Sequence, residues 1–106
     1  MATPKPGRRV RGSSSGRPIM VLLDLLGRRW TLRVLWELRD GPLTFRALQS
    51  AVGGVSPTVL NARLAELRES GFVDNEDAGY ELTDEGKELR RSLGPLYEFA
   101  GRWGGR

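Results

Sequence analysis

The side chains best suited to chemistry lie in one short segment, SPTVLNARLAELRES, at residues 56–70. Ser56 offers an oxygen that can cap a helix, and Pro57 fits a first helical turn, where no backbone N–H is needed. At about 100° per residue, one face of that helix is apolar, with Leu60, Leu64 and Leu67. The other face carries small and polar residues, namely Thr58, Asn61, Ala62, Ala65 and Glu69.

Asparagine can pair with adenine and threonine can contact the thymine methyl group, so this face suits the major groove of DNA. A solvated amphipathic helix gives the same pattern, and this segment alone does not separate the two interpretations.

The composition argues against enzyme and metal chemistry. The chain has no cysteine and no histidine, which excludes disulfides, thiolate zinc sites, cysteine or histidine nucleophiles and the usual base of a Ser-His-Asp arrangement. Its acidic residues are scattered along polar stretches, where a solvated helix face is the ordinary interpretation. A carboxylate-dependent enzyme would need acids that converge in a pocket, and no motif predicts one. We therefore expect no enzyme, no cofactor and no metal site.

The elements around residues 56–70 predict a helix-turn-helix. Thr44 can cap a preceding helix whose apolar face is Phe45, Leu48 and Val52, and Gly53-Gly54 should end it. The second helix then starts immediately at Ser56 and ends at Gly71. Two helices around a tight glycine-containing turn form the helix-turn-helix layout.

Two further helices are predicted upstream. The first runs from Pro18 to Gly27. Apolar residues occur on almost all of its faces, which suggests that it is buried on two sides. The second runs from about Trp30 to Arg39 and stops at Gly41-Pro42. We expect Trp30 and Trp36 to be packing residues, because large aromatic residues at helical spacing usually belong to a core.

Downstream, two short strands and a long helix are predicted. The strands, Phe72–Asn75 and Tyr80–Leu82, surround a polar turn and form a hairpin of the kind called a wing. Thr83 can cap the last helix, whose apolar residues alternate at spacings of four and three and indicate a seam for a partner chain: Leu89, Leu93, Leu96, Ala100 and Trp103. Gly94-Pro95 should kink that helix. The predicted fold class is mainly α with a small β-hairpin, a winged helix-turn-helix.

Length and charge set the domain limits. The chain has 106 residues and a net charge of +4, which fits one domain. Residues 1–17 are rich in Pro, Gly, Ser and Arg, and we expect a disordered basic N-terminal tail. Residues 18–106 are close to charge balance and should form the winged domain with its C-terminal dimerisation helix. A basic start followed by an apolar run could mimic a signal peptide, but Asp24 interrupts that run, which argues against export. No apolar stretch is long enough to span a membrane. We therefore expect a cytoplasmic protein with no membrane partner.

Three segments, in this order and spacing, make the chain similar to one family. They are LLGRRWTLRVLWELRDGPLTFRALQ, VSPTVLNARLAELRESGFV and YELTDEG, and over about residues 22–103 the chain resembles the HxlR family of winged-helix regulators. The resemblance implies a sequence-specific, DNA-binding transcriptional regulator. It also implies a homodimer that binds a palindromic operator in double-stranded DNA through the helix Ser56–Ser70.

The resemblance also implies roles for individual residues. Ser56, Pro57, Thr58, Asn61 and Ala62 fall on the groove-facing positions of the family. Arg63 falls on a frequently basic position, where it holds either a phosphate or a neighbouring carboxylate. Arg46 is placed to contact a phosphate, whereas Arg28 and Arg29 either lie near DNA or stay solvated. The dimer is expected to form through the first and last helices, with Leu22, Leu23, Leu26, Leu93, Leu96, Phe99 and Trp103.

The chain departs from the family pattern in two ways. Many members sense oxidants through a cysteine, and a chain without cysteine cannot carry such a thiol switch. The wing is short and acidic, with Asp74, Glu76 and Asp77, and should repel phosphate, so we expect the basic tail to lie along a groove in its place.

The alternative function is a winged-helix protein-interaction module without specific DNA binding. The near-zero net charge of residues 18–106 and the acidic wing favour this module. An outer face of the Ser56 helix that stays uncharged until Glu66 and Glu69 argues against it. A small-molecule effector would leave no motif, and the sequence leaves that question open.

Overall fold

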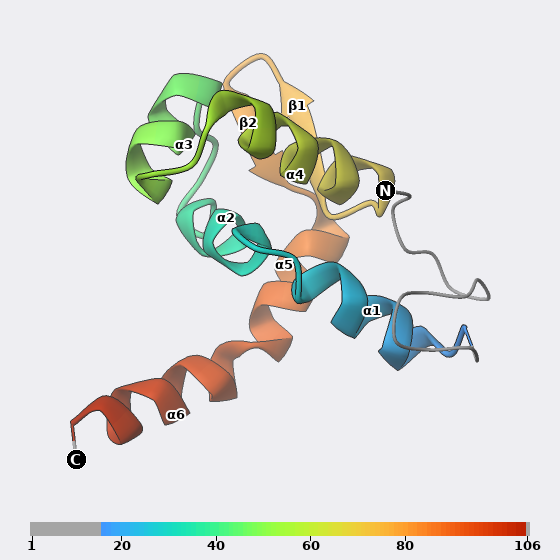
Figure 1. The fold of residues 1–106 in the computed structure, drawn as a ribbon, viewed down its shortest axis with the longest axis vertical. Helices are drawn as coiled ribbons and strands as arrows, with labels where there is room; N and C mark the ends of the chain where they lie inside the picture. Colours follow the sequence, from blue (N-terminus) through green and yellow to red (C-terminus); the bar gives the residue numbers. More distant parts are fainter. Residues whose placement is uncertain (1–15, 106) are drawn as a thin grey trace.

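The computed structural model describes residues 16–105, so most of the predicted tail lies outside the described residues. The described chain is mainly helical with one hairpin, which confirms the predicted fold class (Figure 1). The elements follow in the order α1 (Pro18–Leu26), α2 (Thr31–Glu37), α3 (Phe45–Val52), α4 (Pro57–Glu69), β1 (Val73–Glu76), β2 (Gly79–Leu82), α5 (Asp84–Ser92) and α6 (Gly94–Gly104).

The core lies between α2, α3, α4 and the hairpin. Leu60, Leu64 and Leu67 of α4 are buried, as their spacing predicts, and they pack in one cluster with Leu48 of α3 and Leu35 of α2. Burying a leucine side chain stabilises a fold by about 1.5–3 kcal/mol. The inner face of α4 is therefore fixed by apolar packing, and the remainder of its surface is free to face outward.

The helix starts are capped as predicted. The side-chain oxygens of Thr44, Ser56 and Thr83 accept hydrogen bonds from the backbone N–H groups of Ala47, Val59 and Gly86 at 3.1, 3.1 and 3.0 Å. Each bond satisfies a backbone donor that has no partner within its helix. These caps define where α3, α4 and α5 begin.

The second predicted helix is shorter than expected. α2 begins at Thr31, because Trp30 has a φ of +80° and so cannot continue a right-handed helix. Trp30 and Trp36 are both half-buried, and Trp30 packs against the core as predicted.

The hairpin is anchored by a contact that the sequence analysis does not predict. Val73 pairs with Leu82 and Glu76 with Gly79. β1 therefore begins and ends one residue later than expected, whereas β2 begins one residue earlier and ends at Leu82 as expected. Leu43, in the loop between α2 and α3, exchanges two backbone hydrogen bonds with Tyr80, at 2.9 and 2.8 Å. A side chain at Gly79 would place its Cβ 2.5 Å from the Leu43 carbonyl oxygen, so glycine is required here. The wing is thus attached to the start of the helix-turn-helix.

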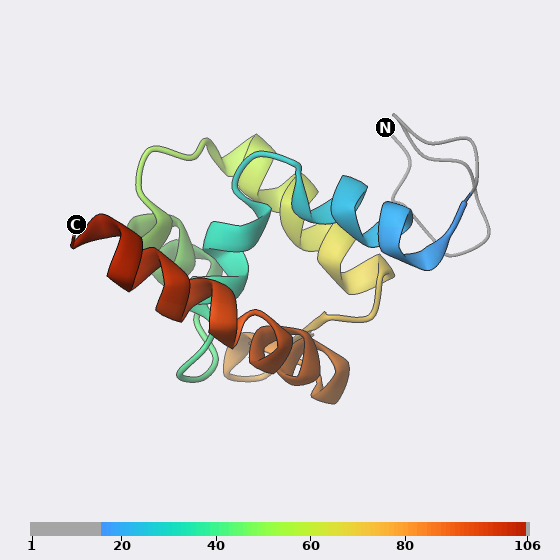
Figure 2. The ribbon, with the colours of Figure 1, turned by 90° about the horizontal axis from the view of Figure 1, so that it is seen from below.

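The last helix is broken at the predicted position. Gly94-Pro95 starts α6 soon after α5 ends, and α6 extends away from the body of the molecule in Figure 1. Seen from below, the same helix crosses in front of α2 and α3 (Figure 2). The ring of Tyr97 packs edge-on against Trp36, with ring centroids 4.7 Å apart. The guanidinium of Arg39 lies 4.0 Å from the centroid of the same tryptophan ring. Burial raises the pKa of Tyr97 above its usual value, while the nearby Arg90 and Arg39 oppose that shift.

Candidate nucleic-acid interface

The outer face of α4 carries the predicted reading residues. Thr58, Asn61 and Ala65 are exposed, Ala62 is half-buried, and Ser56 and Pro57 are exposed at the start of the helix. Gly53 and Gly54 adopt φ values of +71° and +74°, which allows the sharp turn between α3 and α4. The helix-turn-helix layout that the sequence predicts is therefore present, with the predicted outer residues on its second helix.

Two of the predicted arginines are accessible. Arg46, in the first turn of α3, is exposed and forms no ion pair within residues 16–105. Arg29 is also exposed, and its guanidinium lies 4.7 Å from the ring centroid of Trp30. A cation held on an aromatic ring is kept at one place on the surface, which lowers the entropy cost of a phosphate contact.

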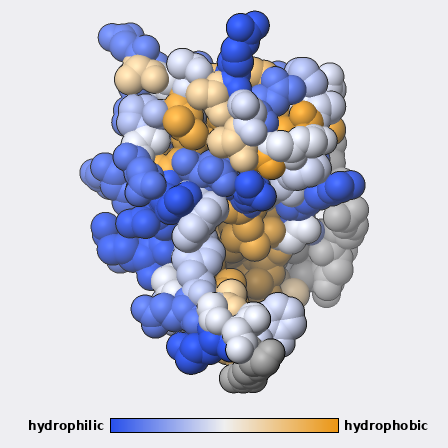
Figure 3. All heavy atoms as spheres, turned by 90° about the vertical axis from the view of Figure 1, so that its left-hand side faces the viewer, coloured by the Kyte–Doolittle hydropathy of each residue, from blue (hydrophilic) through white to orange (hydrophobic). Residues whose placement is uncertain are grey.

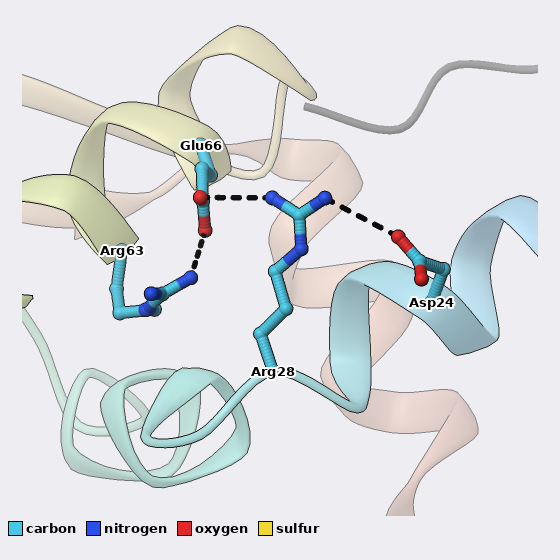
Figure 4. A network of polar contacts seen from close by, with 4 residues as sticks. All are labelled: Asp24, Arg28, Arg63 and Glu66. Atoms are coloured by element: carbon cyan, nitrogen blue, oxygen red, sulfur yellow. Dashed lines mark hydrogen bonds and ion pairs between the residues drawn. The ribbon is translucent and has the colours of Figure 1, made fainter. Parts of the chain in front are cut away.

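Arg28 is placed differently from the expectation. Its side chain is only 4% exposed and lies in the turn between α1 and α2, beneath α4. Its Nη2 atom lies 3.2 Å from Oδ2 of Asp24, and its Nη1 atom lies 2.8 Å from Oε2 of Glu66 (Figure 4). The expectation that Arg28 lies near DNA or stays solvated is wrong, because two carboxylates hold its guanidinium inside the protein.

Glu66 also departs from the expectation. It is buried beside the inner face of α4, and its Oε1 atom accepts a hydrogen bond of 2.7 Å from Nη1 of Arg63. Of the two roles left open for Arg63, the structure shows the contact with a neighbouring carboxylate. Because Glu66 is buried, the outer face of α4 stays free of acidic residues as far as Glu69.

The wing keeps its acidic residues in solvent. Asp74, Asn75, Glu76 and Asp77 are all exposed at the tip of the hairpin. None of them pairs with a cation within residues 16–105. The wing tip therefore presents uncompensated negative charge.

A second surface is apolar. Leu23 of α1 and Leu96, Phe99 and Trp103 of α6 are exposed, Trp103 by 65%, whereas Leu22, Leu26 and Leu93 are half-buried. Ile19 and Leu32 are also exposed, and the predicted interface does not include them. Ile19 could have been predicted, because it lies four residues before Leu23 and so shares its face. Seen from the side of α3 and α6, apolar residues gather between hydrophilic borders (Figure 3). No helix within residues 16–105 is long and apolar enough to cross a membrane.

Comparison with known proteins points in one direction. A sequence model of one family, described as HxlR-like helix-turn-helix, matches residues 25–106. The uncharacterized HTH-type transcriptional regulator YvaP of Bacillus subtilis is 32% identical over 88 residues, which cover 76% of this chain and 82% of YvaP.

Solved structures agree with that match. A possible HxlR family transcriptional factor from Thermoplasma volcanium superposes with a TM-score of 0.74 at 30% identity, covering 84% of this chain and 86% of that one. The quinone-bound YodB of Bacillus subtilis gives a TM-score of 0.74 at 27% identity, covering 79% and 96% of the two chains.

Proposed function

The chain belongs to the HxlR-like helix-turn-helix family of transcriptional regulators, and from this premise we propose that it binds a palindromic operator in DNA as a homodimer. The observation that carries the proposal is the outer face of α4. This face is exposed, small and uncharged in its first turns, while its inner face is fixed by the core. A helix of this shape can enter the major groove without placing a charge against the base edges.

Asn61 and Thr58 are the residues we assign to base reading. Both side chains are exposed on the first half of α4, where recognition helices contact base edges. Asn61 supplies the donor and acceptor pair that adenine requires, and Thr58 supplies a methyl group and a hydroxyl. Ala62 and Pro57 leave room for the bases, and the backbone around Ser56 faces the phosphates at the positive end of the helix.

Arg46 and Arg29 are the residues we assign to the DNA backbone. Their positions on α3 and beside Trp30 leave both guanidinium groups in solvent. Arg63 is a weaker candidate, because Glu66 already neutralises it. We further propose that the acidic wing stays away from phosphates and that the basic tail replaces it along a groove.

The apolar face of α6 supports the homodimer. Leu96, Phe99 and Trp103 lie on one side of the helix, and Glu98 lies on the other. An exposed face with three large apolar residues marks an interaction site, and two-fold dimers with a helix-turn-helix bind inverted repeats. We include the exposed Ile19 and Leu23 of α1 in the same interface, and we propose that this regulator works in the cytoplasm without a membrane partner.

The alternative is a protein-interaction module, which the exposed acidic wing favours. Selection of bound fragments from genomic DNA by the purified protein separates the two functions. For the proposed function we expect an inverted repeat, with Asn61→Ala and Thr58→Ala each lowering affinity for it by about 10-fold or more. Ser50→Ala, an exposed serine on α3, is the control and should bind normally. Weak binding that ignores sequence would contradict the proposal and favour the interaction module.

A further inference from the structure

The network around Arg28 joins two helices that have different tasks. Asp24 lies on α1, Arg28 lies in the turn after it, and Glu66 lies on α4 with Arg63 as its second partner (Figure 4). The side chains of Asp24, Arg28 and Glu66 are 8%, 4% and 11% exposed. Other ion pairs, such as Arg33 with Glu37 or Arg91 with Glu88, join neighbours within one helix. The network thus connects a helix with an exposed apolar face to the helix that reads DNA.

Apolar packing buries the inner face of α4, but it supplies no directional contacts. Leu60, Leu64 and Leu67 are held by contacts that have no preferred direction. Hydrogen bonds from a guanidinium to a carboxylate are directional, and Arg28 Nη2 donates one to Asp24 while Arg63 Nη1 donates one to Glu66. The ion pair of 2.8 Å between Arg28 and Glu66 then joins the two helices. Glu66 lies on the flank of α4, roughly 80° around the helix from Thr58 at 100° per residue. A contact at that flank sets the direction in which the reading face points.

We propose that Arg28 is a positioning residue, which fixes the reading helix relative to the helix through which two copies pair. This inference rests on the proposed function, since it concerns the geometry of the dimer on its operator. In a two-fold dimer, the separation of the two reading helices determines the spacing between half-sites. By holding Asp24 and Glu66 together, Arg28 makes that separation a single value, and the regulator accepts one operator spacing.

The four charged groups balance each other, which explains how the network is tolerated inside the protein. Two arginines face two carboxylates, and Glu66 is shared between both arginines. Removing only one partner would leave an uncompensated buried charge, whereas replacing the whole set with apolar side chains often preserves stability. This difference allows positioning to be tested apart from folding.

The decisive variant is therefore Asp24→Val/Arg28→Met/Glu66→Leu, which replaces the three most buried charges of the network with apolar side chains and leaves Arg63 in place. Arg63 is partly exposed and long enough to reach solvent once Glu66 is gone. Arg91→Met is the matched control, because it also removes an arginine from an ion pair, but an exposed one within α5. A cooperative thermal transition must be retained in both proteins.

The first readout needs no DNA. The chain has no cysteine, so Arg68→Cys, at an exposed position on α4, provides a single site for a spin label. Double electron-electron resonance then measures the distance between the two reading helices of the dimer. We expect one narrow distance in the otherwise unchanged protein and in the control, and a broadened or shifted distribution in the apolar variant. The same narrow distance in the apolar variant, or no intermolecular distance in the unchanged protein, would overturn the inference.

The second readout uses operators whose half-sites are separated by spacers that differ one base pair at a time. The unchanged protein should prefer one spacing by about 10-fold or more, and the apolar variant by about 3-fold or less, with single half-site affinity retained. An undiminished spacing preference in the apolar variant would again overturn the inference. If the unchanged protein shows a narrow distance that the variant loses, yet binds no operator, then the positioning role stands and the proposed function fails.

Discussion

Arg28 illustrates how one residue can be misplaced by its sequence context. It stands next to Arg29 in a basic, glycine-flanked turn, which is typical of exposed cations, and nothing in that turn indicates that two carboxylates enclose it. The partner Glu66 is 38 positions away, so only the tertiary fold brings the charges together. Pairing of this kind is decided by the packing of α1 on the rest of the domain, and local patterns carry no record of it.

Replacement of Arg28 alone should destabilise the protein strongly. In Arg28→Met, Asp24 loses its cation and Glu66 keeps only Arg63, and breaking a buried pair in this way costs about 3–5 kcal/mol. Urea unfolding at one fixed protein concentration measures the change in the free energy of unfolding. Arg91→Met removes an exposed ion pair and should cost less than about 1 kcal/mol. Equal effects of the two substitutions would show that the buried network contributes no more than a surface pair.

Tyr97 should make stability depend on alkaline pH. Burial raises the pKa of its hydroxyl above the ordinary value of 10.0, so the folded state binds the proton more tightly than the unfolded state. The stabilisation is complete below pH 10 and is lost as the pH rises through the raised pKa. Tyr97→Phe should abolish this alkaline loss in thermal melts, whereas Tyr80→Phe, which leaves Tyr97 in place, should retain it.

At neutral pH, Tyr97→Phe should change the free energy of unfolding by less than about 1 kcal/mol. The Tyr97 hydroxyl is buried and accepts or donates no hydrogen bond within residues 16–105, so its removal sacrifices no polar contact. The contact between the phenyl ring and Trp36 is retained. A large loss at neutral pH would mean that the hydroxyl has a partner.

Among the elements, those with strong local signals were predictable. The caps at Thr44, Ser56 and Thr83 and the break at Gly94-Pro95 depend only on residues within one turn, and all are found where the sequence places them. The pairing of Leu43 with Tyr80 was not predictable, because it joins residues 37 positions apart through backbone atoms that leave no side-chain signature. The left-handed conformation of Trp30 was likewise not predictable, because a tryptophan rarely adopts a positive φ.

Gly79 is the position at which the wing is most sensitive. In Gly79→Ala, the new Cβ would lie 2.5 Å from the Leu43 carbonyl oxygen, at a φ of +121° that alanine rarely adopts. Relief of this clash requires the wing to separate from the loop before α3, and we expect a loss of about 1–3 kcal/mol in the free energy of unfolding. Gly101→Ala on α6, where nothing lies within 4 Å, should instead be neutral or slightly stabilising. Equal stability of both variants would contradict the role assigned to Gly79.

For the whole molecule, the candidate site was predictable to the extent that it depends on helix periodicity. The outer positions Thr58 and Asn61 follow from the spacing of the buried leucines, and the structure places both side chains in solvent. The apolar surface was only partly predictable. Leu22, Leu26 and Leu93 were expected at the dimer interface, but they are half-buried within their own chain. The helical repeat could not predict this burial, because it does not reveal which apolar residues one domain covers by itself.

The surface that remains apolar permits a test of the assembly. Leu96→Glu/Phe99→Glu places two carboxylates on the exposed apolar face of α6, where each would lose hydration if a second copy covered it. We expect sedimentation equilibrium to show a dimer that dissociates at least 100-fold more readily, which corresponds to about 2.7 kcal/mol. Glu98→Lys changes a charge on the opposite face of the same helix and should leave the dimer intact. Because Leu96 and Phe99 are already 51% and 45% exposed in the single chain, the monomer should remain folded, and its affinity for a full operator should fall to that for a half-site. A double-glutamate variant that still forms dimers would place the interface elsewhere, and the separation of the reading helices would then have to be fixed by another surface.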